Sequence, residues 1–284
     1  MLFERVAIVG VGLIGGSLAL AARRAGLIGE VIGVGRGAAN LQDAIDLGIA
    51  DRVTSDPTAI GPVDLVVLAV PVRSTPAVAR SLAPGLAPGT VVTDVGSVKE
   101  WVVAQTQAEL PDHSPFVGAH PIAGSERTGA RAARVDLFEN STCVITPVDT
   151  TPAPAREAVG ALWRGVGARV REMPPAEHDR ALAWTSHLGH VLSYALSRSV
   201  GDAGGDLPSL GGPSLRELTR LAGGSAAMWR DIFLSNDRAV LAAVDGFAAA
   251  LADLRGAIER GDDAALDALL ELGTAARRRI EGAS

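Results

Sequence analysis

The stretch Val6-Ala7-Ile8-Val9-Gly10-Val11-Gly12-Leu13-Ile14-Gly15 decides the fold. Apolar residues typical of a strand run directly into three spaced glycines, and a helix-length segment follows. In such a unit the first glycine permits a tight turn, the second lets a pyrophosphate approach the backbone, and the third lets the helix pack closely on the strand. The helix N-terminus then offers N–H donors and partial positive charge to phosphates. The stretch predicts dinucleotide binding; the alternative is a domain of the same shape that has lost its ligand.

Segments with strand and helix character alternate from residue 1 to about residue 172. Short β-rich runs bounded by Gly, Pro or Asp lie at residues 6–9, 31–34, 65–70, 91–94, 116–119 and 143–146, and helix-length segments lie at residues 14–25, 38–47, 75–82 and 98–110. A further helix near residues 154–165 and a strand at residues 168–172 continue the pattern. This repetition predicts a parallel sheet covered by helices on both faces.

The rest of the chain has a helical pattern. Pro175 suits the first turn of a helix that reaches Val200, and the Gly- and Pro-rich residues 201–213 are typical of a loop. Apolar residues then recur at three- and four-residue spacing from Val240 onward. We therefore expect one domain of residues 1–172 and a helical domain of residues 173–284. The apolar stripes are wide for so few helices, which predicts a homodimer through the helical domain.

Composition excludes several classes of function. The chain has 284 residues, a net charge of −6 and no basic cluster, so we expect no nucleic-acid partner. The apolar residues 6–22 are interrupted by glycines and lack a basic segment before them and a small-residue cleavage pattern, so we expect no signal peptide and no membrane anchor. The single cysteine, Cys143, fits a reducing compartment, which predicts a soluble cytoplasmic protein. The histidine spacing predicts no metal site.

The end of the second predicted strand bears on which dinucleotide binds. About 20 residues after the glycine pattern, an Asp or Glu would bond the ribose hydroxyls of NAD. Here the strand ends at Gly35-Arg36, so no carboxylate stands there to repel a 2′-phosphate, and the Arg36 guanidinium can pair with one. This favours NADP and leaves NAD open. The alternative is that Arg36 is a solvated arginine in an arginine-rich chain.

Three further segments follow predicted strands, at the edge where open α/β sheets bind ligands. Val70-Pro71 would lie beside the nicotinamide. Because the ordinary pKa of histidine is near working pH, His120 is the candidate base or hydrogen-bond acceptor for an alcohol being oxidised; the alternative is a structural histidine. Ser97 can orient either the imidazole or the substrate hydroxyl. Lys99 is the only lysine of the chain, which suggests a role that a guanidinium cannot fill.

Candidate substrate contacts also occur in the helical half. Arg216 and Arg220 are four residues apart and share a helix face, and two guanidiniums on one face can bind carboxylates. The large side chains of His187 and Trp229 can line the same cleft. The alternative is that both arginines are surface charges and that Trp229 belongs to the core.

Taken together, these segments resemble a known family. The glycine pattern at residues 10–15, Asp94-Val95-Gly96-Ser97-Val98-Lys99, Gly118-Ala119-His120-Pro121 with Gly124 and Glu126, Ser186-His187-Leu188 and the segments at residues 215–220 and 228–232 are similar to the prephenate/arogenate dehydrogenases of tyrosine biosynthesis. The resemblance covers essentially the whole chain. It implies an α/β fold in which a Rossmann-type parallel sheet domain precedes an all-α dimerisation domain.

The resemblance implies oxidative decarboxylation of prephenate to 4-hydroxyphenylpyruvate with hydride transfer to NAD(P), or of arogenate to tyrosine. The sequence does not separate the two substrates. By position, the resemblance makes His120 the catalytic acceptor, Ser97 its hydrogen-bonding partner and Arg220 the main clamp for a substrate carboxylate. Members often carry Asp where Gly35 stands, so their NAD preference does not transfer. Further pocket residues implied by the resemblance are Arg216, His187, Trp229 and Glu126.

Two other functions fit parts of the pattern. A β-hydroxyacid dehydrogenase or imine reductase would share the architecture, but those families rest on a catalytic lysine in the helical half, and no lysine follows Lys99. A non-enzymatic nucleotide sensor would need the glycine pattern but would have no use for Ser97, His120 and the pair of arginines. The sequence therefore favours the dehydrogenase.

Overall fold

The computed structural model describes residues 1–125 and 127–282. These residues fall into two compact units, one ending at Asp237 and the other beginning at Arg238. The first unit therefore holds the sheet together with the first helices of the helical half. The boundary at residue 172 that the sequence suggests stays a prediction.

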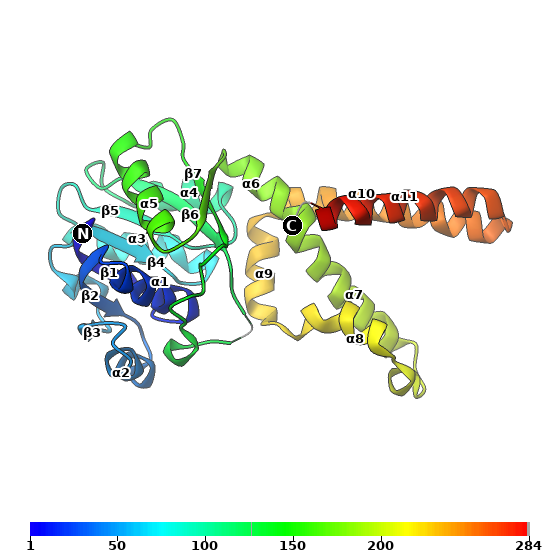
Figure 1. The fold of residues 1–284 in the computed structure, drawn as a ribbon, viewed down its shortest axis with the longest axis horizontal. Coiled ribbons are helices and arrows are strands. Elements are labelled where there is room, and N and C mark those ends of the chain that lie inside the picture. The colour runs from blue at the N-terminus through cyan, green and yellow to red at the C-terminus, as the bar shows by residue number, and fades with distance from the viewer. Residues whose placement is uncertain (126, 283–284) are drawn as a thin grey trace. The chain divides into compact units, whose positions relative to one another are not determined.

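The first unit is built on a sheet of eight strands in the order β3-β2-β1-β4-β5-β6-β7-β8 (Figure 1). The strands are β1 (Phe3–Val9), β2 (Ile28–Val34), β3 (Arg52–Thr54), β4 (Leu65–Leu68), β5 (Val91–Asp94), β6 (Phe116–Ile122), β7 (Thr142–Thr146) and β8 (Arg169–Glu172). Strands β1 to β6 pair in parallel, as the sequence predicts. Strand β7 departs from that prediction because it pairs antiparallel with β6.

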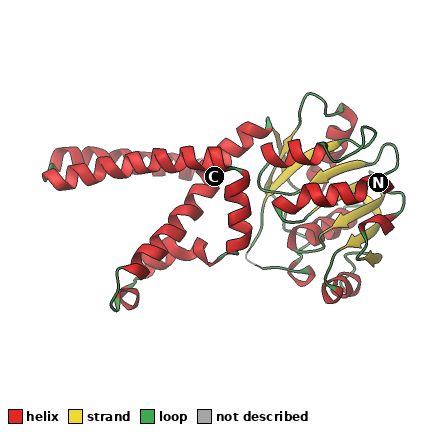
Figure 2. Cartoon of the chain, turned by 180° about the vertical axis from the view of Figure 1, so that it is seen from behind, coloured by secondary structure: helices red, strands yellow, loops and turns green. Residues whose placement is uncertain are grey.

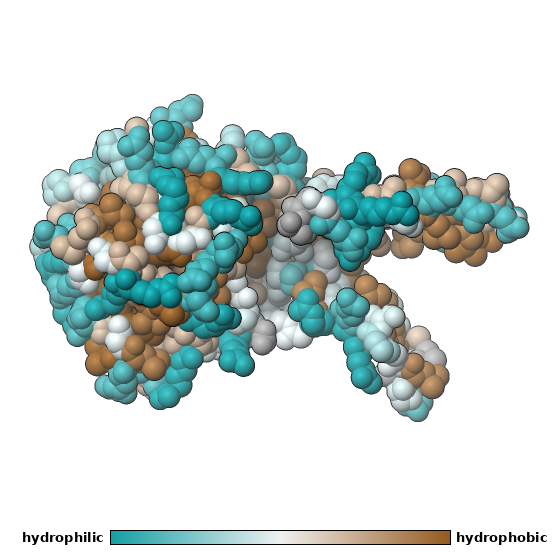
Figure 3. Space-filling model, viewed as in Figure 1, coloured by the Kyte–Doolittle hydropathy of each residue, from teal (hydrophilic) through white to brown (hydrophobic). Residues whose placement is uncertain are grey.

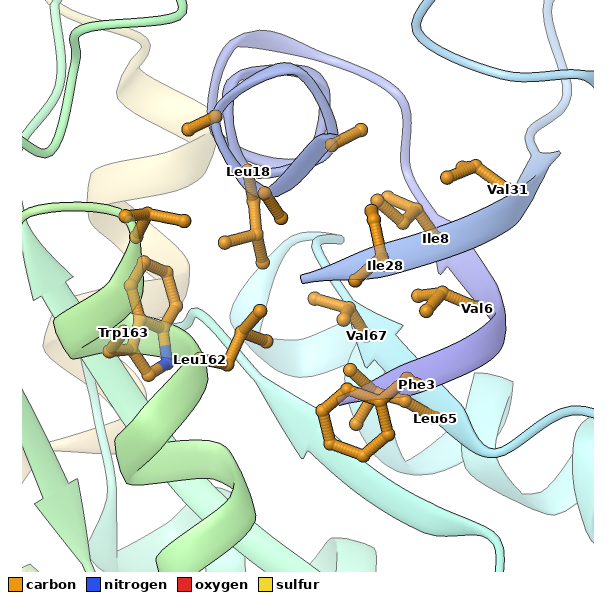
Figure 4. Packing of buried hydrophobic residues seen from close by; sticks show 14 of the residues in the cluster. Phe3, Val6, Ile8, Leu18, Ile28, Val31, Leu65, Val67, Leu162 and Trp163 are labelled. Carbon is orange, nitrogen blue, oxygen red and sulfur yellow. The ribbon is translucent and has the colours of Figure 1, made fainter. Parts of the chain in front are cut away.

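Helices on both faces bury this sheet, which confirms the expected α/β layering. They are α1 (Leu13–Arg24), α2 (Ala38–Asp46), α3 (Thr75–Leu82), α4 (Glu100–Gln107) and α5 (Ala153–Gly165). Alternate residues of β1 enter two separate hydrophobic clusters: Val6 and Ile8 join one, and Ala7 and Val9 join the other. Figure 4 shows the first cluster, where Leu18 and Trp163 approach the sheet from α1 and α5.

A long helical segment with one irregular turn follows the sheet. Helix α6 (Pro175–Leu182) passes through a π-helical turn (Ala183–His187) into α7 (Leu188–Asp202). Such π-turns often occur at functional sites. Helices α8 (Pro213–Thr219) and α9 (Ala226–Ser235) come next. Two α9 side chains, Trp229 and Ile232, belong to the same hydrophobic cluster as Val72, so α9 packs against the sheet domain.

The second unit consists of all but the first residue of α10 (Asp237–Arg260) together with α11 (Asp263–Gly282). Figure 2 shows both as long helices. Several of their large apolar side chains are exposed, namely Leu241, Leu251, Ile258, Leu270 and Leu272. Figure 3 shows these helices with a hydrophobic and a hydrophilic side. Within the described residues, no helix combines the length and the apolar character that crossing a membrane requires.

Candidate active site

The turn between β1 and α1 needs glycine at two positions. Gly10 has a φ of +99°, and a Cβ there would lie 2.1 Å from the backbone oxygen of Ala69. A Cβ on Gly15 would lie 2.4 Å from the backbone oxygen of Gly10. The first glycine thus permits the turn and the third permits close packing of α1 on β1, which are the roles that the sequence pattern predicts.

Gly12 leaves room for a phosphate group. A Cβ there would meet only the backbone nitrogen of Gly129, at 4.0 Å, so it would project into open space. No side chain caps α1, whose first residues are Leu13 and Ile14. Their N–H groups have no partner within the helix and point out of its N-terminus, where the helix dipole favours an anion. The residues present therefore fit the pyrophosphate of a dinucleotide.

Two other predicted cofactor contacts lie at the same edge of the sheet. Gly35 and Arg36 directly follow β2; Arg36 is exposed and forms no ion pair or hydrogen bond with any residue that the structure describes. Val70 and Pro71 follow β4, and Val70 Cγ1 lies 3.4 Å from the place that a Cβ on Gly10 would take. The Val70 side chain is therefore next to the glycine turn.

His120 lies inside β6 instead of after it. The sequence predicts that this strand ends at residue 119, but pairing with β7 extends it to Ile122 and sets His120 opposite Val144. The side chain is only 9% exposed. The segment after β6 passes the glycine turn, because a Cβ on Gly124 would lie 4.0 Å from Ile14 Cδ1. His120 and the turn therefore belong to one region.

His120 forms a hydrogen bond with a second buried histidine. Its Nδ1 lies 2.8 Å from Nε2 of His178, and Nδ1 of His178 lies 2.7 Å from Oδ1 of Asp179. The Asp179 carboxylate also accepts the backbone N–H groups of Lys99 and Glu100, at 2.7 and 2.8 Å. Asp179 thus joins the first residues of α4 to the two imidazoles.

Lys99 and Asp94 form a buried ion pair between β5 and β6. The ammonium group of Lys99 bonds the Asp94 carboxylate and, at 2.9 Å, the backbone oxygen of Ala119. The carboxylate in turn accepts the N–H groups of Gly96 and Ala119, at 2.9 and 3.1 Å. Both charged side chains are fully buried. The lone lysine therefore ties the end of β5 to the residue before His120, in a space that suits a compact ammonium group.

Burial sets the charge of His120. It lowers the pKa of this imidazole well below the ordinary value of 6.5, and the positive charge of the nearby Lys99 lowers the pKa further. His120 is therefore uncharged at neutral pH. An uncharged imidazole can accept a proton, which is the property that a base for alcohol oxidation needs.

His187 lies in the π-helical turn and is buried. The side-chain amide of Asn236 donates to the backbone oxygen of Asp179 at 2.9 Å and lies 3.1 Å from Nδ1 of His187. Burial lowers the pKa of His187 to about 4. Its Nε2 is buried and has no hydrogen-bond partner among the described residues. The His187 and Trp229 rings are 6.1 Å apart, edge to face.

Trp229 also brings His190 and Arg220 into this region. His190 stacks on the indole with 3.4 Å between ring centroids. Burial lowers the pKa of His190, and the charge of Arg220 lowers it further. Arg220 is exposed and forms no ion pair with any described residue. Contacts therefore lead from His120 through α6 to Trp229 and His190, and the charge of the unpaired Arg220 guanidinium acts on His190.

Three predicted site residues are not joined to this group. Ser97 is half-buried and forms no hydrogen bond with His120 or any other described residue; the bond of His120 goes to His178 instead. Arg216 is exposed, and within the described chain its side chain has no ion pair. Glu126 lies outside the described residues. The roles of these three residues stay predictions.

Sequence reasoning missed His178, Asp179, Asn236 and His190. One local signal was available, because His178-Asp179 places an imidazole beside a carboxylate just after a helix start. His178 forms a hydrogen bond with His120, which lies 58 residues earlier in the sequence, so only the folded structure shows that this pair belongs to the site.

Comparisons with known proteins agree with this arrangement. The sequence profile described as prephenate dehydrogenase, nucleotide-binding domain, matches residues 18–172. The profile described as prephenate dehydrogenase, dimerization domain, matches residues 174–272. This chain belongs to the prephenate dehydrogenase family. Its glycine turn lies just before the part matched by the first profile.

Individual relatives of this prephenate dehydrogenase family member cover nearly all of the chain. A cyclohexadienyl dehydrogenase of Zymomonas mobilis is 37% identical over 95% of this chain and 92% of its own length. The crystal structure of prephenate dehydrogenase from A. aeolicus in complex with hydroxyphenyl propionate and NAD+ is 34% identical, with a TM-score of 0.93 and 98% of each chain covered. Arogenate dehydrogenase of Synechocystis is 28% identical, with a TM-score of 0.84, and covers 98% of this chain and 100% of its own.

Proposed function

We propose that this chain catalyses the oxidative decarboxylation of prephenate to 4-hydroxyphenylpyruvate in tyrosine biosynthesis, with arogenate as the alternative substrate. One observation carries the proposal: His120 is buried and uncharged in the region of the glycine turn, and contacts through α6 connect it to His190, on which the charge of the unpaired Arg220 guanidinium acts. Family membership and the A. aeolicus complex support it.

The reaction requires a group that accepts the hydroxyl proton and a group that binds a substrate carboxylate. The ring carbon that carries the substrate hydroxyl gives up a hydride, and the nicotinamide, when bound, accepts it. His120 takes the hydroxyl proton, so the hydroxyl becomes a ring carbonyl. The bond between the ring and its carboxylate then breaks and carbon dioxide leaves. The electron pair of that bond moves through the ring onto the carbonyl oxygen, which makes the ring an aromatic phenolate that takes up a proton from solvent to give the phenol. Aromatisation makes the step effectively irreversible.

Arg220 is the proposed clamp for a substrate carboxylate. Replacing it with alanine should raise the KM for prephenate by roughly 10- to 100-fold, because a hydrogen bond to a charged group contributes about 1.5–3 kcal/mol. Steady-state kinetics with saturating cofactor measure this change. Arg198→Ala is the control, since Arg198 pairs with Asp202 on the surface of α7 and should leave KM unchanged. An unaltered KM in Arg220→Ala would remove this residue from the pocket.

For the cofactor we propose NADP over NAD. No carboxylate follows β2 at Gly35, and the exposed Arg36 guanidinium has no partner in the described chain. A guanidinium in that place can form a bidentate contact with a 2′-phosphate, whereas NAD has only hydroxyls there.

Arg36→Ala should raise the KM for NADP about ten-fold or more and leave the KM for NAD nearly unchanged, because only NADP loses a charged partner. Rates at varied concentrations of each cofactor check this difference. A matched control is Arg73→Ala, which removes an exposed arginine from the turn after β4. Equal effects of Arg36→Ala on both cofactors would contradict the assignment.

The proposed function is tested directly by assaying prephenate and arogenate, each with NAD and with NADP. Reduced cofactor and carbon dioxide should form in equal amounts, with the largest kcat/KM in the NADP assays. No turnover of either substrate with either cofactor would overturn the proposal.

The helical half is proposed to form a homodimer. Apolar side chains exposed on α10 and α11 support this, and so does the match of residues 174–272 to a profile described as a dimerization domain. Burying such side chains in a second copy removes them from water. Size-exclusion chromatography with light scattering should give twice the chain mass of 29.0 kDa at micromolar concentration. A stable monomer would contradict the dimer.

A further inference from the structure

Two buried groups, His178 and Asp179, form a hydrogen-bonded line behind the imidazole of His120. His178 is fully buried, and Asp179 is 1% exposed. Nitrogen Nδ1 of His120 contacts Nε2 of His178, and Nδ1 of His178 contacts Asp179 Oδ1. The reaction described above assigns no role to His178 or Asp179.

The positions of the protons follow from the acceptor end of this line. Both oxygens of the Asp179 carboxylate accept backbone N–H groups at the start of α4, where the helix dipole favours a negative charge. Oδ1 therefore acts as an acceptor toward His178 as well, and Nδ1 of His178 donates. In the uncharged form of His178, Nε2 then holds a lone pair. Nδ1 of His120, at 2.8 Å from it, must carry the proton.

The competing arrangement has a different chemical outcome. If His178 were an imidazolium, both of its nitrogens would donate, and the proton of His120 would move to Nε2. His120 would then present a donor, not an acceptor, to a substrate hydroxyl. Of the two arrangements, only the first presents an acceptor to the substrate hydroxyl, and the NMR experiment below distinguishes them.

We propose that His178 and Asp179 are positioning residues that hold His120 as the Nδ1–H tautomer, so that its Nε2 is the acceptor for the substrate proton. Nε2 of His120 has no hydrogen-bond partner among the described residues, as an acceptor reserved for substrate requires. The catalytic consequence rests on the proposed function, whereas the tautomer is a property of the free protein.

His178 and Asp179 also act on the positively charged form of His120 that proton transfer produces. The substrate hydroxyl gives its proton to Nε2 of His120, whose Nδ1 proton stays in place and continues to bond His178. The resulting positive charge then faces the lone pair of His178 and, beyond it, the Asp179 carboxylate. After product release, Nε2 returns its proton to solvent, and the original tautomer is restored.

Nitrogen-15 NMR of the histidine rings in the full-length protein tests the tautomer without any substrate. His120→Asn identifies the His120 signals by their disappearance. At pH 7.5 we expect Nδ1 of His120 to be protonated and Nε2 to have the shift of a bare nitrogen. An Nε2–H tautomer of His120, or a His178 protonated on both nitrogens, would overturn the proposal. This readout is independent of whether prephenate is the substrate.

Two substitutions at His178 test the effect on catalysis. His178→Phe keeps the ring volume but offers no acceptor, so kcat should fall by about 100-fold, at the lower end of what proton transfer contributes. His178→Gln can offer a side-chain oxygen in place of Nε2 and should restore kcat to within about ten-fold of the wild type. The Kd for the cofactor should not change in either variant.

The exposed His113 provides the control, because His113→Phe removes a histidine outside this line. Equal losses of kcat in the Phe and Gln variants, with the NMR tautomer of His120 unchanged, would reduce His178 to a packing role and overturn the proposal. If His178→Phe does not fold, the wild-type NMR spectrum still decides the tautomer.

Discussion

Replacing His120 with asparagine should lower kcat by about 10²- to 10⁴-fold, the usual contribution of a positioned acid or base. Asparagine cannot take a proton from the substrate hydroxyl. The glycine turn, which is proposed to bind the cofactor, does not include residue 120. The Kd for NADP, measured by titration without substrate, should therefore stay near the wild-type value. Equal losses of cofactor affinity and of activity would make His120 a structural residue.

The pH dependence of the wild-type enzyme follows from the same imidazole. Burial places the pKa of His120 in the folded protein well below its ordinary value of 6.5. The uncharged acceptor form therefore persists as the pH falls through 6.5 and is lost only below that value. The acid limb of kcat/KM should lie below pH 6.5. A limb at or above pH 6.5 that vanished in His120→Asn would contradict this picture.

Replacing Lys99 with methionine should lower the free energy of unfolding by about 3–5 kcal/mol, because removing one partner of a buried ion pair leaves an uncompensated charge. Asp94 would stay fully buried without its ammonium partner, and the backbone oxygen of Ala119 would lose a donor. Urea unfolding followed by circular dichroism measures the change.

Two controls separate this effect from a general loss of charge. Arg198→Met breaks a surface pair and should cost less than about 1 kcal/mol. The double substitution Asp94→Asn with Lys99→Met should be more stable than Lys99→Met alone, because no unpaired charge remains buried. If the single substitution Lys99→Met cost under 1 kcal/mol, the ion pair would not contribute as proposed.

Local patterns in the sequence predicted the features that depend on local geometry. The positive φ of Gly10 and the close approach at Gly15 arise within one strand–turn–helix unit, so the glycine spacing was enough to predict them. The burial of short strands such as Leu65–Leu68 at every position likewise follows from their unbroken apolar sequence. The α/β architecture and the order of sheet before helices were therefore predicted correctly.

Features that depend on distant partners were not predicted. Strand β7 pairs antiparallel because it lies beside β6, and nothing in the sequence of residues 142–146 specifies that direction. Strand β3 has only three residues, Arg52–Thr54, too few for a periodic pattern. The bond of His120 to His178 was missed for a similar reason, since side chains 58 residues apart meet only in the folded chain.

The complete burial of Lys99 also governs how the native protein reacts with reagents that target primary amines. Because Lys99 is the chain's only lysine, no ε-amine is available at the surface of the folded molecule. Acylating dyes and amine cross-linkers would therefore find no side-chain amine to modify in the folded protein. Labelling of Lys99 itself would mark molecules whose sheet had opened.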